Sequence, residues 1–304
     1  MSFLRAYIRE SLEEVLIQEA SGGRVLDRLT NQMSRSIIDI LKDPQVRKRH
    51  AEPRFKKFDD GSKEPIPLNL VLGDERKSWF ARLLATILPS RRSQKFSGGM
   101  DPELLDDLEN IDRIVIRVFV AEPDESGDIW WNTEAAYIAN TRDRSKSVLE
   151  VALWLPTNYD FKIFPALIPE LKEAIRHELE HGAQTTEKLE GGKEVLSLKG
   201  GESEQFKDPK ALVNFYTTGG ELEAYVTGLY KKAKSLRIPA SDVIDEILGD
   251  VYYRAIDAGM SESDALGSLS EVRHKWYNYL LSRYPQSLRH VQGVVTVDDS
   301  ESQE

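Results

Sequence analysis

The sequence contains no cysteine, and it has no apolar run long enough to cross a membrane. Without cysteine the chain can form neither disulfides nor thiolate nucleophiles, and every zinc site that uses a Cys ligand is excluded. Charged residues interrupt the apolar stretches every few positions, whereas a membrane-spanning helix needs about 20 consecutive apolar residues. We therefore expect no transmembrane helix, and any metal site must be built from His, Asp or Glu.

The first residues also lack the pattern of a secretory signal. The apolar core of a signal peptide cannot include Arg9, Glu10, Glu13 and Glu14. We therefore expect the chain to stay in the compartment where it is made.

Positive charge is in the minority, because 41 Lys and Arg face 51 Asp and Glu and give a formal net charge of −10. Proteins that bind nucleic acid through phosphates rely on clustered Lys and Arg, so this balance argues against nucleic acid as a partner. Residues 47–57 are a local exception with seven basic or histidine side chains: Arg47, Lys48, Arg49, His50, Arg54, Lys56 and Lys57. Such a run is compatible with an acidic partner and with simple solvation.

The apolar pattern predicts a mostly helical amino-terminal region over residues 1–110, with a basic loop inside it. Apolar residues that recur every three to four positions predict an amphipathic helix that docks on a partner surface, and further helices after it. The predicted helices cover residues 3–16, 25–41, 76–88 and 103–109. The polar, proline-punctuated stretch 43–67 predicts a loop or linker.

Residues 111–235 form the predicted core. Segments rich in β-branched and aromatic residues predict three strands over 114–120, 129–138 and 148–155. A helix is predicted over 169–184, with Pro169 in its first turn. A long loop over 185–217, with a possible short strand at 195–198, follows this helix.

The carboxyl-terminal part continues the helical pattern. Periodicity predicts helices over 221–233, 241–258 and 263–283, so that residues 236–304 form a helical region that ends in an acidic tail at 298–304. The predicted fold class is α+β, with a small sheet, one prominent helix, and helical regions on both sides of this core.

Residues 176–181 read R-H-E-L-E-H and place the pattern H-E-x-x-H inside the predicted helix. Residues four apart lie one turn above each other, so His177 and His181 can direct their imidazole nitrogens at one point, as two zinc ligands do. Glu178 lies beside that point, where a general base is needed. The alternative is that both histidines are ordinary surface or core residues of a helix.

A catalytic zinc needs a third protein ligand. The remaining histidines are distant in sequence, which favours an acidic residue on a neighbouring helix, either Glu221 or Glu223. These two residues lie about 200° apart around a helix, so only one can face the metal. We favour Glu221, because its face carries the small Ala224 and Gly228, whereas the face of Glu223 looks more solvated.

A structural role for Glu221 remains a separate possibility. Thr218-x-x-Glu221 is also a capping-box pattern, in which the glutamate would only bond backbone at the start of its helix.

The histidine helix, followed about 40 residues later by Glu221-x-x-Ala224, resembles the gluzincin-like zinc metallopeptidases. The resemblance implies a zincin-like core with a small antiparallel or mixed sheet, an active-site helix, and an edge strand that pairs with an extended substrate. It implies Zn²⁺ held by His177, His181 and Glu221. Tyr225 departs from the pattern, because many gluzincins have an aspartate at this place that holds a ligand histidine. Glu180 or an aspartate of the loop over 185–217 is a candidate for that role.

The arrangement is also similar to that of predicted peptidases of tailed bacteriophages, and residues 2–10 look like the start of many tailed-phage proteins. We therefore expect a protein of the cytoplasm, that of the host cell if a phage encodes it, or a virion-associated protein. The main hypothesis is a zinc-dependent hydrolase that cleaves protein or peptide substrates with Glu178 as general base.

Two further hypotheses remain open. The first is a non-enzymatic structural or virion-assembly protein that retains a metal-binding zincin fold and docks through its amino-terminal helix. The second is a nucleic-acid or regulatory module that uses the basic residues 47–57.

Overall fold

The computed structural model describes residues 26–57, 62–72, 111–121, 131–138, 147–183 and 206–284. The chain divides into two compact units, Met1–Gln184 and Thr185–Glu304, and each is described here by itself. In the described part, no helix is long and apolar enough to cross a membrane. Several predicted elements lie outside the described residues: the helices over 3–16, 76–88 and 103–109, the possible strand at 195–198, and the acidic tail.

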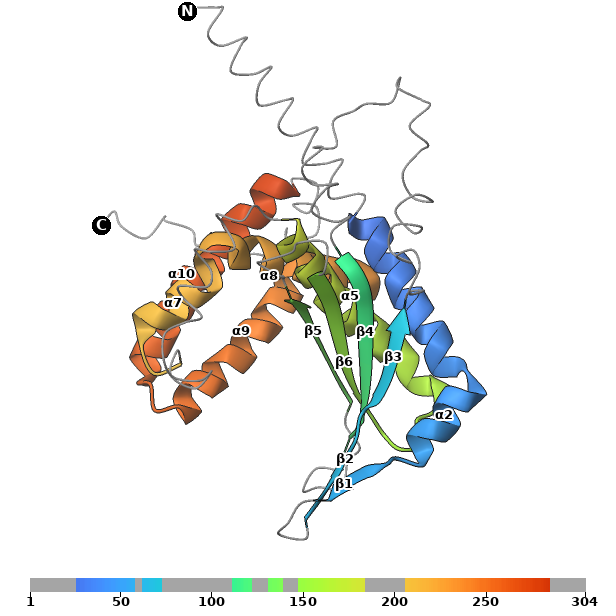
Figure 1. Cartoon of the computed structure of the whole chain (residues 1–304). Coiled ribbons are helices and arrows are strands. Elements are labelled where there is room, and N and C mark those ends of the chain that lie inside the picture. The colour runs from blue at the N-terminus through green and yellow to red at the C-terminus, as the bar shows by residue number, and fades with distance from the viewer. Residues whose placement is uncertain are drawn as a thin grey trace, which may run out of the picture. The chain divides into compact units, whose positions relative to one another are not determined.

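The first unit contains a four-stranded mixed sheet. Its strands are β3 (Leu68–Leu72), β4 (Ile111–Val120), β5 (Asn132–Ile138) and β6 (Ser147–Leu155). They lie in the order β3-β4-β6-β5, with β4 and β6 parallel and the other neighbours antiparallel (Figure 1). The three predicted strands are confirmed, and β3 was not predicted because it is short and directly follows the proline-rich stretch. The observed fold is a mixture of α and β structure with a small mixed sheet.

Two helices cover one face of this sheet. Residues 26–42 are helical, as predicted, and α5 spans Phe164–Gly182. Side chains of β6 alternate between fully buried and half-buried positions, because successive residues of a strand point to opposite faces. The buried set, Leu149, Val151, Leu153 and Leu155, packs with the apolar stripes of both helices in one continuous core. The sheet and α5 therefore hold each other in fixed register.

Helix α5 begins earlier than the predicted start at Pro169. A short 3₁₀ turn, η3 (Phe161–Ile163), leads into the helix, and Pro165 is the proline of its first turn. Pro169 lies inside the helix and has no N–H to bond the preceding turn. The prediction was wrong here because two prolines four apart both suit a helix start, and the apolar pattern could not decide between them.

The stretch 43–67, predicted as a loop or linker, contains regular structure instead. It forms α2 (Pro44–Ala51) and a hairpin of β1 (Phe55–Lys57) and β2 (Lys63–Pro65). The Asp43 carboxylate accepts hydrogen bonds from the Gln45 and Val46 amides at 2.7 and 3.4 Å, so it caps the helix start. Apolar periodicity missed α2 because His50 is its one buried residue.

The second unit is helical in its described part. It contains α7 (Pro209–Thr217), α8 (Gly219–Leu236), α9 (Ala240–Asp257) and α10 (Glu262–Arg283). The last three confirm the predicted helices. The first corrects the predicted loop over 185–217, since Asp208 caps the Lys210 amide at 2.8 Å and Pro209 opens the helix. Helix α10 packs against the other three helices around the fully buried Trp276.

Candidate metal centre

Helix α5 brings the two predicted histidines together. Their Nε2 atoms lie 3.0 Å apart, and their ring centroids are separated by 4.7 Å at an interplanar angle of 76°. The spacing of four residues explains this, because side chains one turn apart share a helix face. The imidazoles therefore converge on one point, as the sequence predicted.

The distance between the two nitrogens suits a shared divalent ion. A zinc–nitrogen bond is about 2.0–2.1 Å long, so two tetrahedral nitrogen ligands lie about 3.3 Å from each other. The observed 3.0 Å falls short of this value by a few tenths of an ångström, which a small rotation of either ring supplies. Neutral imidazole is also a common zinc ligand, so both geometry and donor chemistry fit.

Glu178 presents its two carboxylate oxygens in different directions. Oε1 lies 3.8 Å from His177 Nε2, and Oε2 accepts the backbone N–H of Tyr137 at 2.6 Å. The Glu178 and His177 side chains are 12% and 16% exposed, so both are shielded and still reachable by a small molecule. His177, Glu178 and His181 form a group whose ligand atoms lie within 4.8 Å of one another and could hold a metal ion.

The amide of Tyr137 can reach Glu178 because of the register of β5. Tyr137 stands opposite Leu149 of β6, and its N–H leaves the ladder to meet α5. In an antiparallel pair such positions alternate, so Ala135 and Thr133 also direct their backbone groups to the outer edge. The Thr133 amide is bonded by the Asn132 side chain at 2.8 Å. The strand edge beside Glu178 therefore offers the backbone groups of Ala135.

A buried ion pair fixes α5 beneath the site. Arg176 is 1% exposed and donates to Glu180 one turn later, and its Nε lies 3.6 Å from Asp27 of the helix over residues 26–42. Glu180, a candidate contact for a ligand histidine, is thus engaged by Arg176. The network ties the histidine helix to the neighbouring helix on the same sheet face.

The predicted third ligand lies in the second unit, on α8. Thr218 does not cap this helix through its side chain, because its hydroxyl donates to the Asn214 carbonyl. A capping box needs a hydrogen bond from the threonine side chain to the helix backbone, and Thr218 does not form it. The capping-box alternative for Glu221 is therefore only half fulfilled. Glu221 as metal ligand stays a prediction.

The expectation that Glu223 lies on a wetter face is wrong. Thr227 and Lys231, which share that face, are 1% and 5% exposed. Glu221 and Glu223 are themselves both half-buried, so burial within the unit favours neither of them as ligand.

Two tyrosines that could serve as donors to a reaction intermediate have other contacts. Tyr225 stacks on Trp276 at 5.5 Å and 20°, and Tyr216 lies 5.1 Å from Tyr225. The Trp276 indole donates to the Tyr216 carbonyl at 2.8 Å. These rings form the aromatic core of the second unit, which assigns them a structural role.

Sequence reasoning missed the Tyr137 amide, because a backbone group leaves no mark in the pattern of side chains. A strand ahead of an H-E-x-x-H helix was the one available signal. No family model, curated protein or solved structure matches the chain. The metal-binding potential of His177, Glu178 and His181 therefore stands on their geometry alone.

Proposed function

We propose that the chain is a zinc-dependent metallopeptidase with a zincin-like core. The observation that carries the proposal is the convergence of His177 and His181 beside the anchored carboxylate of Glu178. Two imidazoles one turn apart, with a carboxylate next to the first, are the residue types that hydrolysis assisted by a metal needs. The proposed zinc ligands are His177, His181 and Glu221.

Zinc in such a site would supply the Lewis acidity that makes water a nucleophile near neutral pH. The Nε2 atoms of His177 and His181, which lie 3.0 Å apart, are the proposed donor atoms on α5. A carboxylate as third ligand keeps the net charge of the site positive.

Glu178 is the proposed general base. Its Oε1 lies 3.8 Å from His177 Nε2, where it can take a proton from the attacking water and pass it to the departing amine nitrogen. Its Oε2 is tied to the Tyr137 amide, which fixes the rotation of the carboxylate. A base held in one orientation loses less entropy on the way to the transition state.

Strand β5 is the proposed binding edge for an extended substrate. It stands at one end of the described sheet and is bonded on its other side to β6. A peptide that added to this edge would use the N–H and C=O of Ala135, next to the residue that contacts Glu178. The scissile bond would then lie beside the carboxylate.

The test combines metal analysis with cleavage of an unfolded protein substrate by the purified full chain. We expect about one zinc per chain and cleavage that falls by at least about 10³-fold in Glu178→Gln, because the variant lacks the base and keeps both imidazoles. Glu170→Gln, the same change two turns earlier on α5, is the matched control and should keep full activity.

Zinc binding needs its own control. His177→Ala and His181→Ala should each lose stoichiometric zinc, whereas His274→Ala, at an exposed position of α10, should retain it. Stoichiometric zinc without cleavage that depends on Glu178 would refute the peptidase and leave a metal-binding structural or assembly protein. Absence of zinc from the wild-type chain after incubation with the ion would refute both.

A further inference from the structure

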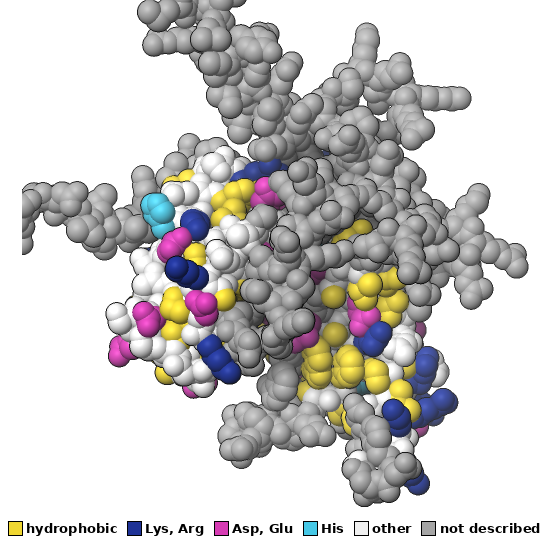
Figure 2. Space-filling view, turned by 60° about the vertical axis from the view of Figure 1, so that its left-hand side comes forward, with side chains coloured by type: hydrophobic (Ala, Val, Ile, Leu, Met, Phe, Trp, Pro, Cys, Tyr) yellow, Lys and Arg dark blue, Asp and Glu magenta, His cyan; other side chains and the backbone are white. Residues whose placement is uncertain are grey.

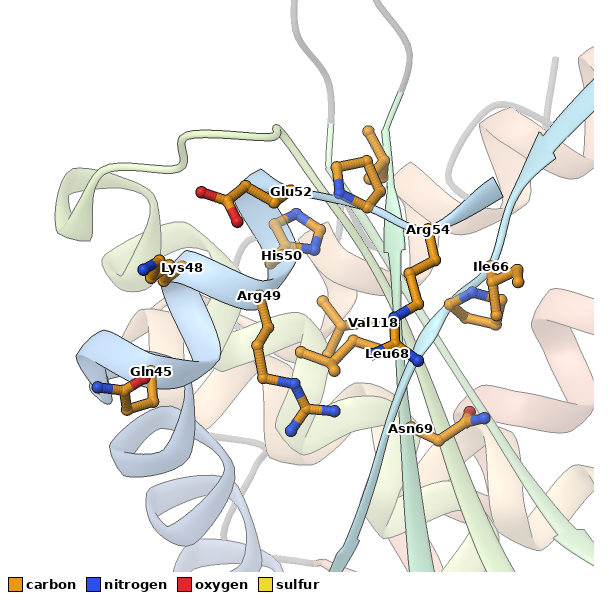
Figure 3. Close-up of a pocket in the computed structure, with 13 residues that line it drawn as sticks. Gln45, Lys48, Arg49, His50, Glu52, Arg54, Ile66, Leu68, Asn69 and Val118 are labelled. Atoms are coloured by element: carbon orange, nitrogen blue, oxygen red, sulfur yellow. The ribbon is translucent and has the colours of Figure 1, made fainter. Parts of the chain in front are cut away.

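A pocket opens on the first unit where α2 passes over the β3 and β4 side of the sheet. Its volume is about 470 Å³, and pockets for small molecules measure about 300–1,000 Å³. Helix α2 and the approach to β1 form one wall, and β3 with the end of β4 forms the other (Figure 3). The pocket is thus built wholly within one unit.

Three cations stand around this pocket. Lys48 and Arg49 come from α2 and Arg54 from the approach to β1, and all three are exposed. Figure 3 shows the guanidinium groups of Arg49 and Arg54 reaching toward the strands, whereas the Glu52 carboxylate points away from both. Within the described ranges, none of these three cations forms an ion pair with a carboxylate. Their charge is therefore available to a ligand.

The opposite wall is mostly apolar, with the exposed Asn69 as its polar residue. Leu68 and Val118 lie between the Arg49 and Arg54 side chains in Figure 3; Leu68 is half-buried and Val118 is only 2% exposed. Ile66 stands at the rim and is 46% exposed, a high value for an isoleucine in the absence of a ligand. The pocket therefore combines a cationic side with a wall that is partly apolar.

Hydrogen bonds of residues that line the pocket hold its walls in place. The His50 Nε2 is 3.2 Å from both the Leu155 and the Pro156 carbonyl, which joins the end of α2 to the end of β6. The Ile66 amide donates to the Arg54 carbonyl at 2.7 Å. A pocket whose backbone is already fixed loses little entropy when a ligand binds.

Arg47 belongs to the same basic stretch but does not line the pocket, and it contacts two aromatic rings instead. Its guanidinium lies 4.7 Å from the Phe161 ring centroid and 5.8 Å from that of Tyr159. It also donates to the Tyr159 carbonyl at 3.4 Å. Arg47 therefore anchors α2 to the chain ahead of α5, while Lys48 and Arg49 are left to the pocket. Figure 2 shows the Lys and Arg side chains gathered at the lower end of this unit, at the height of α2 and β1 in Figure 1.

We propose that this pocket binds a small organic phosphate monoester. Three cations and the one carboxylate among the lining residues give a formal charge of +2, which matches a phosphate monoester with about −1.5 to −2 charges near neutral pH. Arg49 and Arg54 offer planar forks that can bond two phosphate oxygens each, whereas Lys48, whose side chain lies apart from both guanidinium groups in Figure 3, adds positive charge at longer range. The organic group lies against Leu68 and the exposed Ile66.

The proposed site is separate from the metal centre. The pocket uses β3 and β4, and Glu178 contacts β5, which is the strand at the other end of the four. Neighbouring strands lie about 4.8 Å apart, so about 14 Å of sheet separates β3 from β5. A ligand here would be a second ligand of the unit, and the proposal does not depend on the peptidase assignment.

Calorimetric titration of the full chain with phenyl phosphate tests the proposal. We expect saturable binding with a Kd of about 1 mM or tighter near neutral pH. Inorganic phosphate, which lacks the ring, and benzoate, which lacks the second charge, should each bind at least about fivefold more weakly. Binding of benzoate as tight as that of phenyl phosphate would overturn the phosphate assignment.

Single variants locate the site. Arg49→Gln and Arg54→Gln should each weaken phenyl phosphate binding by about tenfold or more, since each removes a charged donor. Arg28→Gln removes the same charge from an exposed position near the start of the helix over residues 26–42, about 20 Å along this helix from its end next to α2, and should change the affinity by less than about twofold. Equal losses in all three variants would show nonspecific attraction and overturn the proposal, as would unchanged binding in both pocket variants. Circular dichroism melting checks that each variant folds.

Two further arms remove competing explanations. Phosphate also binds metal ions, so the titration is repeated with His177→Ala; binding must persist, and its loss would place the ligand at the metal centre and overturn the proposal. A single-stranded oligonucleotide serves as the second probe. If it binds while phenyl phosphate does not, the pocket is part of a nucleic-acid surface and the proposal fails.

Discussion

Tyr137 and Glu178 lie 41 positions apart in the sequence, and a 2.6 Å hydrogen bond joins the backbone N–H of the first to Oε2 of the second. The bond connects the outer strand of the sheet to the helix that carries both histidines. It also settles which backbone groups of β5 face β6 and which face outward, because the Tyr137 amide takes no part in the ladder.

This bond predicts that the Tyr137 amide supports the proposed base. Tyr137→Pro removes the N–H without cutting a ladder bond, since proline is tolerated where a strand amide points away from its neighbour. We expect kcat for peptide cleavage to fall by about tenfold or more relative to Tyr137→Ala, which removes the ring and keeps the amide. Zinc content, measured by atomic absorption, should be equal in the two variants. Equal kcat values in both would contradict a positioning role for the amide.

Two matched variants can decide whether Glu221 or Glu223 is the proposed third zinc ligand. Loss of a ligand carboxylate should weaken zinc binding by at least about 100-fold, more than the 10- to 100-fold typical of residues that only orient a ligand. We expect this loss in Glu221→Gln and less than about threefold change in Glu223→Gln. Competition with a chromophoric chelator measures both affinities. The reverse order would make Glu223 the ligand.

The buried pair of Arg176 and Glu180 predicts a large stability effect. Arg176→Met leaves the Glu180 carboxylate in a buried position without its cation, so α5 should lose about 3–5 kcal/mol of unfolding free energy. The double variant Arg176→Met/Glu180→Leu removes both charges and should recover most of this loss. Hydrogen exchange of the α5 amides, followed by mass spectrometry, measures the stability of the first unit, to which α5 belongs. A double variant no more stable than the single one would contradict the prediction.

His50 predicts a pH dependence of stability. Burial lowers the pKa of this imidazole below its usual value of 6.5, although the bonds to Leu155 and Pro156 act in the opposite direction. Between the lowered pKa and about 6.5 the unfolded chain binds a proton that the folded chain does not, so the free energy of unfolding falls as the pH drops through this range. Above it, the neutral ring contributes its full stabilisation.

Urea unfolding of the wild type and of His50→Gln checks this dependence. The glutamine amide keeps a donor for the same carbonyls and does not titrate, so the variant should lose less stability than the wild type between about pH 7.5 and pH 5. Identical slopes in the two proteins would show that His50 takes no part. The comparison cancels contributions from the other histidines.

Much of the fold could be read from local patterns. Strands β4 and β6 are rich in β-branched and aromatic residues, and α9 and α10 repeat apolar residues at the helical period, so their types were predicted and their ends agree within three residues. The order of strands was beyond this reasoning. Strand β5 lies between β4 and β6 in the sequence but outside them in the sheet, and only packing of the whole unit decides that.

Two short helices were missed although their starts were marked. Both α2 and α7 begin with an aspartate followed by proline, Asp43-Pro44 and Asp208-Pro209, and both aspartates cap their helix in the structure. In each case the polar sequence around the aspartate led to the prediction of a loop, and the capping signal was given too little weight. Capping residues therefore deserved more weight than hydrophobic periodicity in helices of eight or nine residues.

The candidate site was predictable where one helix builds it. His177, Glu178 and His181 follow from their spacing along α5, which needs no knowledge of the rest of the fold. The Tyr137 amide and the Arg176 to Asp27 contact depend on elements distant in sequence, so they became visible only in three dimensions.

The one-turn spacing of the two histidines makes residues 178–180 intolerant of any change in length. A single inserted residue would turn His181 by about 100° and move it about 1.5 Å along the axis, so the imidazole nitrogens could no longer meet. Deletion of one residue would turn His181 by the same angle in the opposite direction, with the same loss of convergence. A substitution at the buried Leu179 would affect mainly the packing of the core, whereas an insertion or deletion between the histidines would destroy the candidate metal centre even in a chain that folds.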